Sequence, residues 1–108
     1  MSTPIGALRR RVSLERREDM FDGAGGMTST YALLSEVFAA VEAKRRRTDV
    51  EGGREIGVVT HLVTIRFRDD LSGRVRIRDG GAIYRVLSTE RADPQGRFLH
   101  LWCEEEQA

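Results

Sequence analysis

The sequence predicts an all-β protein: a small antiparallel β-barrel or sandwich with long loops and room for one short helix. Apolar and polar residues alternate with a period of two in several short segments, which is typical of half-buried strands. Turns containing glycine separate these segments at close spacing, as in small barrels and sandwiches. With 108 residues the chain can bury one modest core, so we expect a single domain over residues 1–108.

The first expected strand starts close to Arg10. Leu8, Val12 and Leu14 recur near a period of two, as a half-buried strand requires. Residues 19–30 then form a polar stretch rich in glycine, which regular elements do not tolerate. We therefore expect a long exposed loop over residues 19–30.

Residues 32–46 carry two conflicting signals. Apolar residues from Leu33 to Val41 recur at helical spacing, and the composition favours a helix. Every second residue from Val37 to Ala43 is also apolar, which fits one side of a pleated strand, and sheet context can override helix propensity. The residues alone leave helix and strand open.

A loop signal and then a strong strand signal follow. Gly52, Gly53 and Gly57 lie among charged residues, so residues 48–57 indicate a loop or a short helical turn. Residues 58–68 alternate and are rich in β-branched side chains, which predicts a strand.

The last third of the chain contains two hairpin signals. Residues 74–78 alternate arginine with apolar residues, and the Asp-Gly-Gly turn at residues 79–81 leads into an expected strand over residues 83–89. An Asp-Pro-Gln-Gly turn at residues 93–96 leads into the last expected strand, residues 97–104. These strands complete the expected barrel or sandwich.

Charge and cysteine content limit the functions and cellular locations that we expect for the chain. The 18 Lys and Arg residues against 17 Asp and Glu residues leave a net charge of +1, so a nucleic-acid role requires local clusters. The one cysteine, Cys103, can form no internal disulfide, which fits a reducing cytoplasm. The N-terminus lacks the apolar core of a signal peptide, and no apolar run reaches the roughly 18 residues of a membrane span. We expect a soluble product that is not exported.

No motif for catalysis or metal binding stands out. His61, His100 and Cys103 lack the spacing of a structural zinc site, which favours packing or surface roles. No serine lies in a nucleophile motif, and the acidic residues 69–70 and 104–106 are typical of solvated surface charge. We expect no enzyme activity, no cofactor and no metal site.

Basic residues gather in two places. The first is a consecutive run with one further arginine close by: Lys44, Arg45, Arg46, Arg47 and Arg54. Phosphate binding requires such local density, and a solvated strand end explains the run equally well. The second group is expected to form a stripe over two neighbouring strands, where arginines more often protect exposed edges from aggregation. Its members are Arg66, Arg68, Arg74, Arg76 and Arg78.

Five short segments have an order and spacing that are informative together. They are residues 6–12 (GALRRRV), 22–26 (DGAGG), 38–42 (FAAVE), 60–68 (THLVTIRFR) and 73–75 (GRV). In this order they resemble the phage head closure proteins, also called head-tail joining or stopper proteins, and the related gene transfer agent connectors. The resemblance covers nearly the whole chain, although Phe38 stands where the family often has tryptophan. It implies a strand, rather than a helix, over residues 32–46.

The resemblance implies a structural and non-catalytic role at the junction of head and tail in a phage, a prophage remnant or a gene transfer agent. Copies would form a homo-oligomeric ring of roughly six or twelve subunits between the head-side portal or adaptor proteins and the tail-side terminator protein. The ring would retain packaged double-stranded DNA without sequence preference and would provide the docking surface for the tail. No membrane partner is expected.

The resemblance also implies where the functional residues lie. The segment after the second strand approaches the channel, so the residues expected to face the lumen or the DNA are Lys44, Arg45, Arg46, Arg47 and Arg54. The glycine-rich loop is expected to contact partner proteins, and its candidate residues are Asp22, Gly23, Gly25 and Gly26.

Two alternative functions stay open. One is a small nucleic-acid-binding barrel of the oligonucleotide-binding type, which would need aromatic stacking residues on its basic face. Only 6% of the residues are aromatic, and alternation places most of them in the core. The other alternative is a tail terminator ring, which differs from a head closure protein in its partner rather than in its chemistry.

Overall fold

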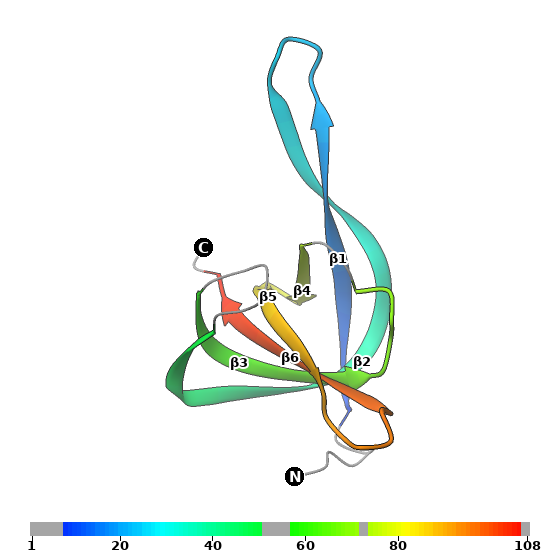
Figure 1. The fold of residues 1–108 in the computed structure, drawn as a ribbon, viewed down its shortest axis with the longest axis vertical. Coiled ribbons are helices and arrows are strands. Elements are labelled where there is room, and N and C mark those ends of the chain that lie inside the picture. Colours follow the sequence, from blue (N-terminus) through cyan, green and yellow to red (C-terminus); the bar gives the residue numbers. More distant parts are fainter. Residues whose placement is uncertain (1–7, 51–56, 72–73, 107–108) are drawn as a thin grey trace.

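The computed structural model describes residues 8–50, 57–71 and 74–106, where the side chains of residues 45–50 and 57 are not described. These residues form six β-strands (Figure 1). They are β1 (Arg10–Phe21), β2 (Met27–Val50), β3 (Gly57–Arg66), β4 (Val75–Asp79), β5 (Ala82–Arg91) and β6 (Phe98–Glu105). The all-β class is confirmed, whereas the short helix that the sequence left room for is absent from the described residues.

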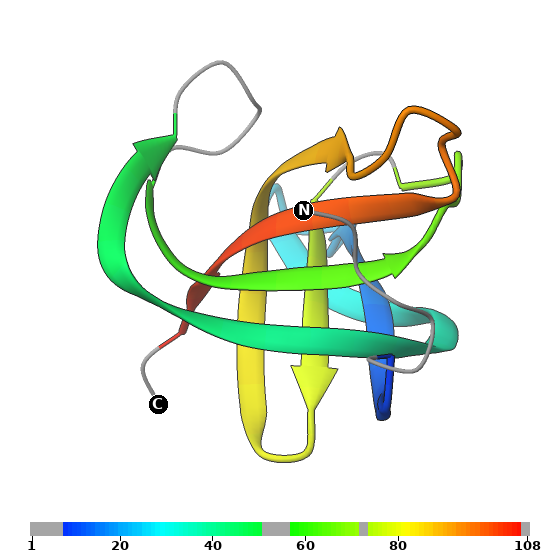
Figure 2. The same ribbon diagram turned by 90° about the horizontal axis from the view of Figure 1, so that it is seen from below.

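The strands close into an antiparallel barrel in the order β1-β2-β3-β6-β5-β4 (Figure 2). The ring of strands is closed by β4, which pairs with β1 between Ser13 and Arg16. Closure pairs strand edges that an open sheet would leave exposed to other chains. Of the two architectures that the sequence predicts, the barrel is therefore the one observed.

The barrel is filled by inward-facing side chains from all six strands. Successive side chains of a strand point to opposite faces, and several core residues accordingly lie two positions apart, as in the pairs Val12 and Leu14, Val63 and Ile65, and Leu101 and Cys103. The largest fully buried side chains are Val12, Leu14, Val59, Val63, Ile65, Ile77, Leu101 and Cys103. Burying one aliphatic side chain of this size contributes roughly 1.5–3 kcal/mol, so this cluster is the main source of barrel stability.

β2 is a strand throughout the segment whose sequence also fits a helix. Ala39 pairs with Arg10 of β1 and with Ile65 of β3, and its side chain is fully buried. Leu33 and Phe38 belong to the helical pattern, yet both are exposed. Hydrogen bonds to two neighbouring strands satisfy the backbone of β2, and this sheet context overrides the helical composition.

The first hairpin extends far beyond the barrel. Among the described strands, β1 pairs only with β2 beyond Arg17. We call the projecting ribbon, residues 18–30, the arm; it makes the molecule 50 Å long against 27 Å in each other direction (Figure 1). The long loop expected over residues 19–30 is wrong, because both strands continue through the arm and only residues 22–26 form a turn.

β2 also runs further than expected at its other end. Residues 48–50 were expected in a loop or a short helical turn, but they belong to β2 and pair with residues 57–59. Gly57 is the first residue of β3. The rest of the expected loop, residues 51–56, lies outside the described residues.

The two later turns agree with the sequence. Gly80, with φ of 60°, lies in the turn between β4 and β5. Between β5 and β6, the Asp93 carboxylate accepts the backbone N–H groups of Arg97 at 2.8 Å and Phe98 at 3.1 Å. Gly96 completes this turn with φ of 69°. Both turns use glycine where φ is positive, since glycine tolerates this region without strain.

Candidate assembly and DNA-contact surfaces

Asp22 closes the turn at the tip of the arm. Its Oδ1 atom accepts the N–H groups of Ala24 at 2.8 Å and Gly26 at 3.0 Å. Its own N–H donates to the Gly26 carbonyl at 3.1 Å. The backbone N–H groups of Ala24 and Gly26 favour the ionised carboxylate and hold the pKa of Asp22 below its ordinary value. The arm therefore ends in a tight, negatively charged turn.

Three glycines make this turn possible. Gly23 and Gly25 have φ values of 81° and 88°, which side chains other than that of glycine rarely adopt. A Cβ atom on Gly26 would lie 2.6 Å from Oδ2 of Asp22, so the carboxylate would have to move. The D-G-x-G-G motif thus specifies one turn geometry, and the contact of these residues with partner proteins stays a prediction.

The tip of the arm exposes large apolar side chains. Phe21 and Met27 are directly paired beside the turn, with 82% and 57% of their surface exposed. Met20, one position before Phe21 and therefore on the opposite face of the ribbon, is 62% exposed. Adjacent exposed apolar side chains often mark a site of protein contact.

Polar and aromatic contacts brace the arm below its tip. The Asp19 carboxylate accepts the Ser29 hydroxyl at 2.6 Å and forms an ion pair with Arg17 at 2.9 Å. These two contacts, the hydroxyl first, hold the pKa of Asp19 below its ordinary value. At the base of the arm, the Arg76 guanidinium lies 3.8 Å from the centre of the Tyr31 ring. The arm is thus connected to the barrel by side chains as well as by its two strands.

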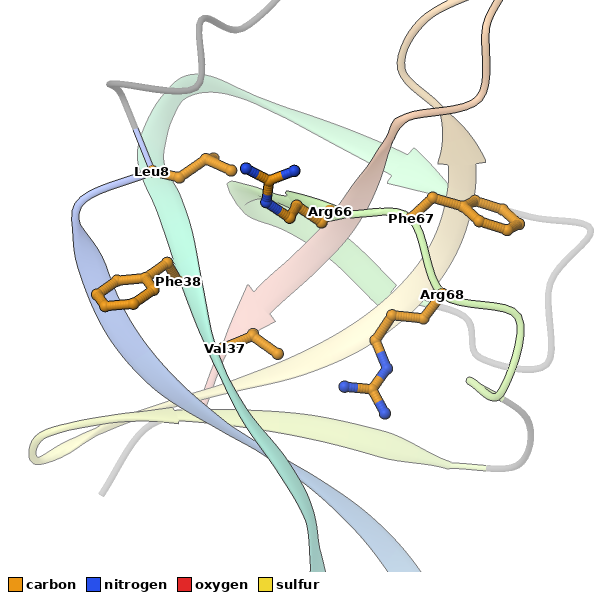
Figure 3. Close-up of a pocket in the computed structure, with 6 residues that line it drawn as sticks. All are labelled: Leu8, Val37, Phe38, Arg66, Phe67 and Arg68. Atoms are coloured by element: carbon orange, nitrogen blue, oxygen red, sulfur yellow. The ribbon is translucent and has the colours of Figure 1, made fainter.

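A groove of about 410 Å³ lies beside β2 at the end of β3 (Figure 3). Its lining residues are Leu8, Val37, Phe38, Arg66, Phe67 and Arg68. Figure 3 shows Val37 and Arg68 directed into the space between β2 and the chain that follows β3. Phe38 is 57% and Phe67 39% exposed. The groove is therefore apolar, and arginines supply the charge of its lining.

The basic run lies where β2 and β3 lose their register. Ala43 pairs with His61 and Thr48 with Val59, so residues 44–47 of β2 face one residue of β3. Extra residues on one strand leave the hydrogen-bonded ladder and form a bulge. The run therefore lies within β2, in a bulge, and not at the strand end that the sequence predicts.

Lys44 is the member of the run whose side chain the structure describes. Its Nζ atom lies 3.6 Å from the Glu42 carboxylate and 5.7 Å from the centre of the Trp102 ring. Of residues 45–47 the structure describes only the backbone, and Arg54 lies outside the described residues. The expected contact of the run with DNA stays a prediction.

The expected arginine stripe over neighbouring strands is wrong. Residues 66–68 lie at the end of β3 and just after it, and residues 74–78 lie just before β4 and within it. β3 pairs with β2 and β6, whereas β4 pairs with β1 and β5, so the two groups of arginines are not on neighbouring strands. Arg76 and Arg78 instead share the Glu15 carboxylate of β1, at 2.6 and 3.4 Å. These arginines join β4 to β1 by ion pairs, and they do not form a continuous basic surface with the end of β3.

The structure places His61 opposite Cys103 and leaves His100 on the outer face of β6. Cys103 is fully buried, and burial raises the pKa of its thiol. The His100 ring lies 3.7 Å from the Glu90 carboxylate. Within residues 8–50, 57–71 and 74–106 no group of three His, Cys, Asp or Glu side chains could hold a metal ion. In the same ranges, no helix is long and apolar enough to cross a membrane.

Exposed aromatic rings are a feature that the sequence pattern does not predict. Alternation predicts that most aromatic residues lie in the core, yet Phe21, Phe38 and Phe67 are exposed. A signal was present for Phe38, because it lies between Val37 and Ala39, which the strand pattern assigns to the inner face. These rings belong to the arm tip and the groove rather than to the basic run.

Comparison with known proteins identifies the family. The family model for the phage head completion protein matches residues 3–106. The chain belongs to this family. Its structure is also similar to a chain in the virion of the native gene transfer agent (GTA) particle, with a TM-score of 0.67 and 27% sequence identity, over 94% of this chain and 97% of that chain. A search of curated proteins finds no match. The resemblance drawn from the sequence motifs is confirmed.

Head completion is a structural task, and this member of the phage head completion family has three surfaces suited to assembly. The arm tip is apolar and acidic, the groove is apolar and carries arginines, and the bulge of β2 carries the basic run. Each surface lies on a different part of the molecule.

Proposed function

We propose that the chain forms a homo-oligomeric ring between the head-side portal or adaptor proteins and the tail-side terminator protein of a phage-like particle. The observation that carries this proposal is the family match over residues 3–106. The similarity to a chain of a gene transfer agent virion supports a place within the particle itself. A ring subunit needs complementary surfaces rather than catalytic groups, and the arm and groove are surfaces of this kind.

Deleting the gene tests the proposed role. We expect filled heads that lose their DNA and tails that accumulate separately, because the ring would both retain DNA and dock the tail. Electron microscopy and measurement of packaged DNA distinguish these products. Heads that never fill would point instead to a portal or packaging role, and intact tailed particles would refute the proposal.

We further propose that the basic run retains the DNA end. In a ring, Lys44, Arg45, Arg46 and Arg47 would recur once per subunit, together with Arg54, and would form a basic collar around the channel. Contacts of lysine and arginine with phosphate weaken steeply with salt and carry no sequence information. The collar would therefore hold any DNA sequence, more weakly as the salt concentration rises.

The triple variant R45A/R46A/R47A tests the collar. We expect it to fold and assemble as the parent does, and to lose DNA faster from assembled heads as salt is raised. The variant R11A, which removes an arginine 66% exposed on β1, is the matched control and should retain DNA normally. If the triple variant retains DNA like the parent at every salt concentration, the run is a solvated surface and there is no collar.

A further inference from the structure

We propose that the arm tip of one copy binds in the groove of the next copy, and that this contact repeats around the ring. The inference rests on the proposed ring and names its interface. Each subunit carries both halves of the contact: the apolar, acidic tip at residues 20–27 and the apolar groove with its arginines at the end of β3. The occupant of the groove is thus a second copy of the same chain.

The arm cannot reach the groove of its own subunit. Phe38 of the groove pairs with Arg11, near the start of β1, whereas Phe21 lies ten positions further along the same strand (21 − 11). At about 3.3 Å per residue this separation is roughly 33 Å. Figure 1 shows the arm leading away from the barrel. An arm tip that fits this groove must therefore come from another subunit.

The apolar groups of the two surfaces are complementary. At the tip, Phe21 and Met27 form one exposed pair beside a narrow turn. The groove volume of about 410 Å³ falls within the range of about 300–1,000 Å³ typical of binding pockets. Phe38 and Phe67 lie at its edges, where Figure 3 shows their rings directed away from Val37 and Arg68, and both are exposed apolar partners for the tip. Aromatic side chains of this kind often dominate the binding energy of an interface.

The charges of the two surfaces are also complementary. The tip contains the Asp22 carboxylate and no lysine or arginine, whereas Asp19 below it is paired with Arg17. The groove lining contains Arg66 and Arg68 and no carboxylate, although Arg68 also contacts Asp70 at 2.7 Å. Attraction between opposite charges favours the tip in the groove. Repulsion between acidic tips disfavours a symmetric contact of arm with arm.

A contact between arm and groove joins two different surfaces. Such a heterologous contact leaves a free arm on one subunit and a free groove on the other, so addition of copies continues until a ring closes. A symmetric contact would instead stop at a dimer. The arrangement within one chain therefore matches what ring assembly requires.

Variants of exposed residues test the contact in the full-length chain. F21S/M27S removes the apolar tip, and F38S removes an exposed ring from the groove; neither change touches the buried core. Sedimentation velocity over a range of concentrations should show self-association of the parent, weakened roughly tenfold or more in either variant. L33S is the matched control, because Leu33 is 63% exposed and lies six positions from Met27 (33 − 27). It should associate like the parent.

Mixing the two variants gives the sharper result. F21S/M27S retains a complete groove and F38S retains a complete arm, so an equal mixture should form one-to-one heterodimers that cannot grow further. Native mass spectrometry identifies these heterodimers by the masses of their subunits. If F38S alone self-associates like the parent, or if the mixture forms no heterodimer although the parent associates, the arm does not bind in the groove.

Cross-linking in assembled particles covers the case in which the isolated chain stays monomeric. The variant A24C/R66C places one thiol in the turn of the arm and one in the lining of the groove, and it keeps Phe21, Met27 and Phe38, while the native Cys103 is buried. Oxidation should then produce a ladder of covalent multimers, which A24C or R66C alone should not produce. Absence of the ladder would overturn the proposal. A ladder in particles, together with normal tail joining when the gene is deleted, would keep the contact and refute the proposed function.

Discussion

The arm and the β4–β5 hairpin have the same architecture, but paired apolar side chains are exposed in the arm and buried in the β4–β5 hairpin. Both are antiparallel hairpins whose turns contain aspartate and glycine. In the β4–β5 hairpin the directly paired residues Ile77 and Tyr84 are buried in the core, at 0% and 6% exposure. In the arm the directly paired Phe21 and Met27 are among the most exposed apolar residues. Paired apolar side chains thus stabilise the fold only where the barrel closes over them, and elsewhere they are available to a partner.

The largest expected effect is the difference in unfolding free energy between a variant of the buried pair and a variant of the exposed pair. I77A should lower the free energy of unfolding by about 2–5 kcal/mol, because it leaves a cavity in the core. F21A should change it by no more than about 0.5 kcal/mol, because the ring is exposed. Urea denaturation followed by tryptophan fluorescence measures both values.

Thiol labelling provides an independent check on this contrast. Cys103 is fully buried, so it should react with a maleimide only when the barrel opens. I77A should speed this reaction and F21A should leave its rate unchanged. An equal loss of stability in the two variants would show that the arm belongs to the folding core.

A smaller effect is expected at the junction of the two regions, where Glu15 binds Arg76 and the arginine stacks on Tyr31. The side chains of Glu15 and Arg76 are only 14% and 17% exposed. E15A removes a charged hydrogen-bond acceptor from a mostly buried donor and should cost about 1–3 kcal/mol. Thermal unfolding of E15A and the parent measures this cost.

The exposed pair of Glu36 and Arg11 is the matched control for the junction. Its side chains are 48% and 66% exposed, so E36A should cost at most about 1 kcal/mol. NMR amide shifts in the arm should change in E15A and not in E36A. Equal effects on stability would mean that the junction contributes no more than a surface ion pair.

The smallest expected effect is a local pH dependence at the arm turn. The pKa of Asp22 is lower in the folded turn than in the unfolded chain, so its contribution to the turn is present above the ordinary aspartate pKa of about 4. This contribution is lost as the pH falls through the lowered folded pKa. The amide shifts of Ala24 and Gly26, which donate to this carboxylate, should move over that pH range.

D22N tests the assignment of this titration. Asparagine keeps an acceptor oxygen but cannot ionise, so the shifts of Ala24 and Gly26 should no longer follow the pH. The amide of Gly81, in the β4–β5 turn, is the internal reference. A titration that persists in D22N would belong to another group, such as Asp19.

The barrel strands could be predicted from the sequence because many of their core residues lie two positions apart, as Val63 and Ile65 do. The alternation around Val63 and Ile65, and the turn at residues 79–81, place β3 and the β4–β5 hairpin nearly correctly. The choice of strand for β2 needed the family resemblance, since propensity and periodicity disagreed. Local patterns thus predict an element well where burial imposes the pattern.

The arm and the arginine pairs could not be predicted in the same way. The arm lies outside the core, so Met20 and Phe21 show no alternation that burial would impose, and the glycines of the turn suggested a loop. The partners of Arg76 and Arg78 depend on barrel closure, which brings Glu15 of β1 beside β4. The order of strands around a barrel is a long-range property, and short motifs carry little information about it.

The bulge that carries the basic run also affects which insertions and deletions the protein can accept during evolution. In a regular ladder, inserting one residue turns every later side chain to the opposite face of the sheet. Between Ala43 and Thr48 the register is already interrupted, and residues 44–47 face one residue of β3. Insertions or deletions there can add or remove positive charge while the buried pattern on either side is kept. The charge of this segment can therefore differ between related chains that keep the same barrel.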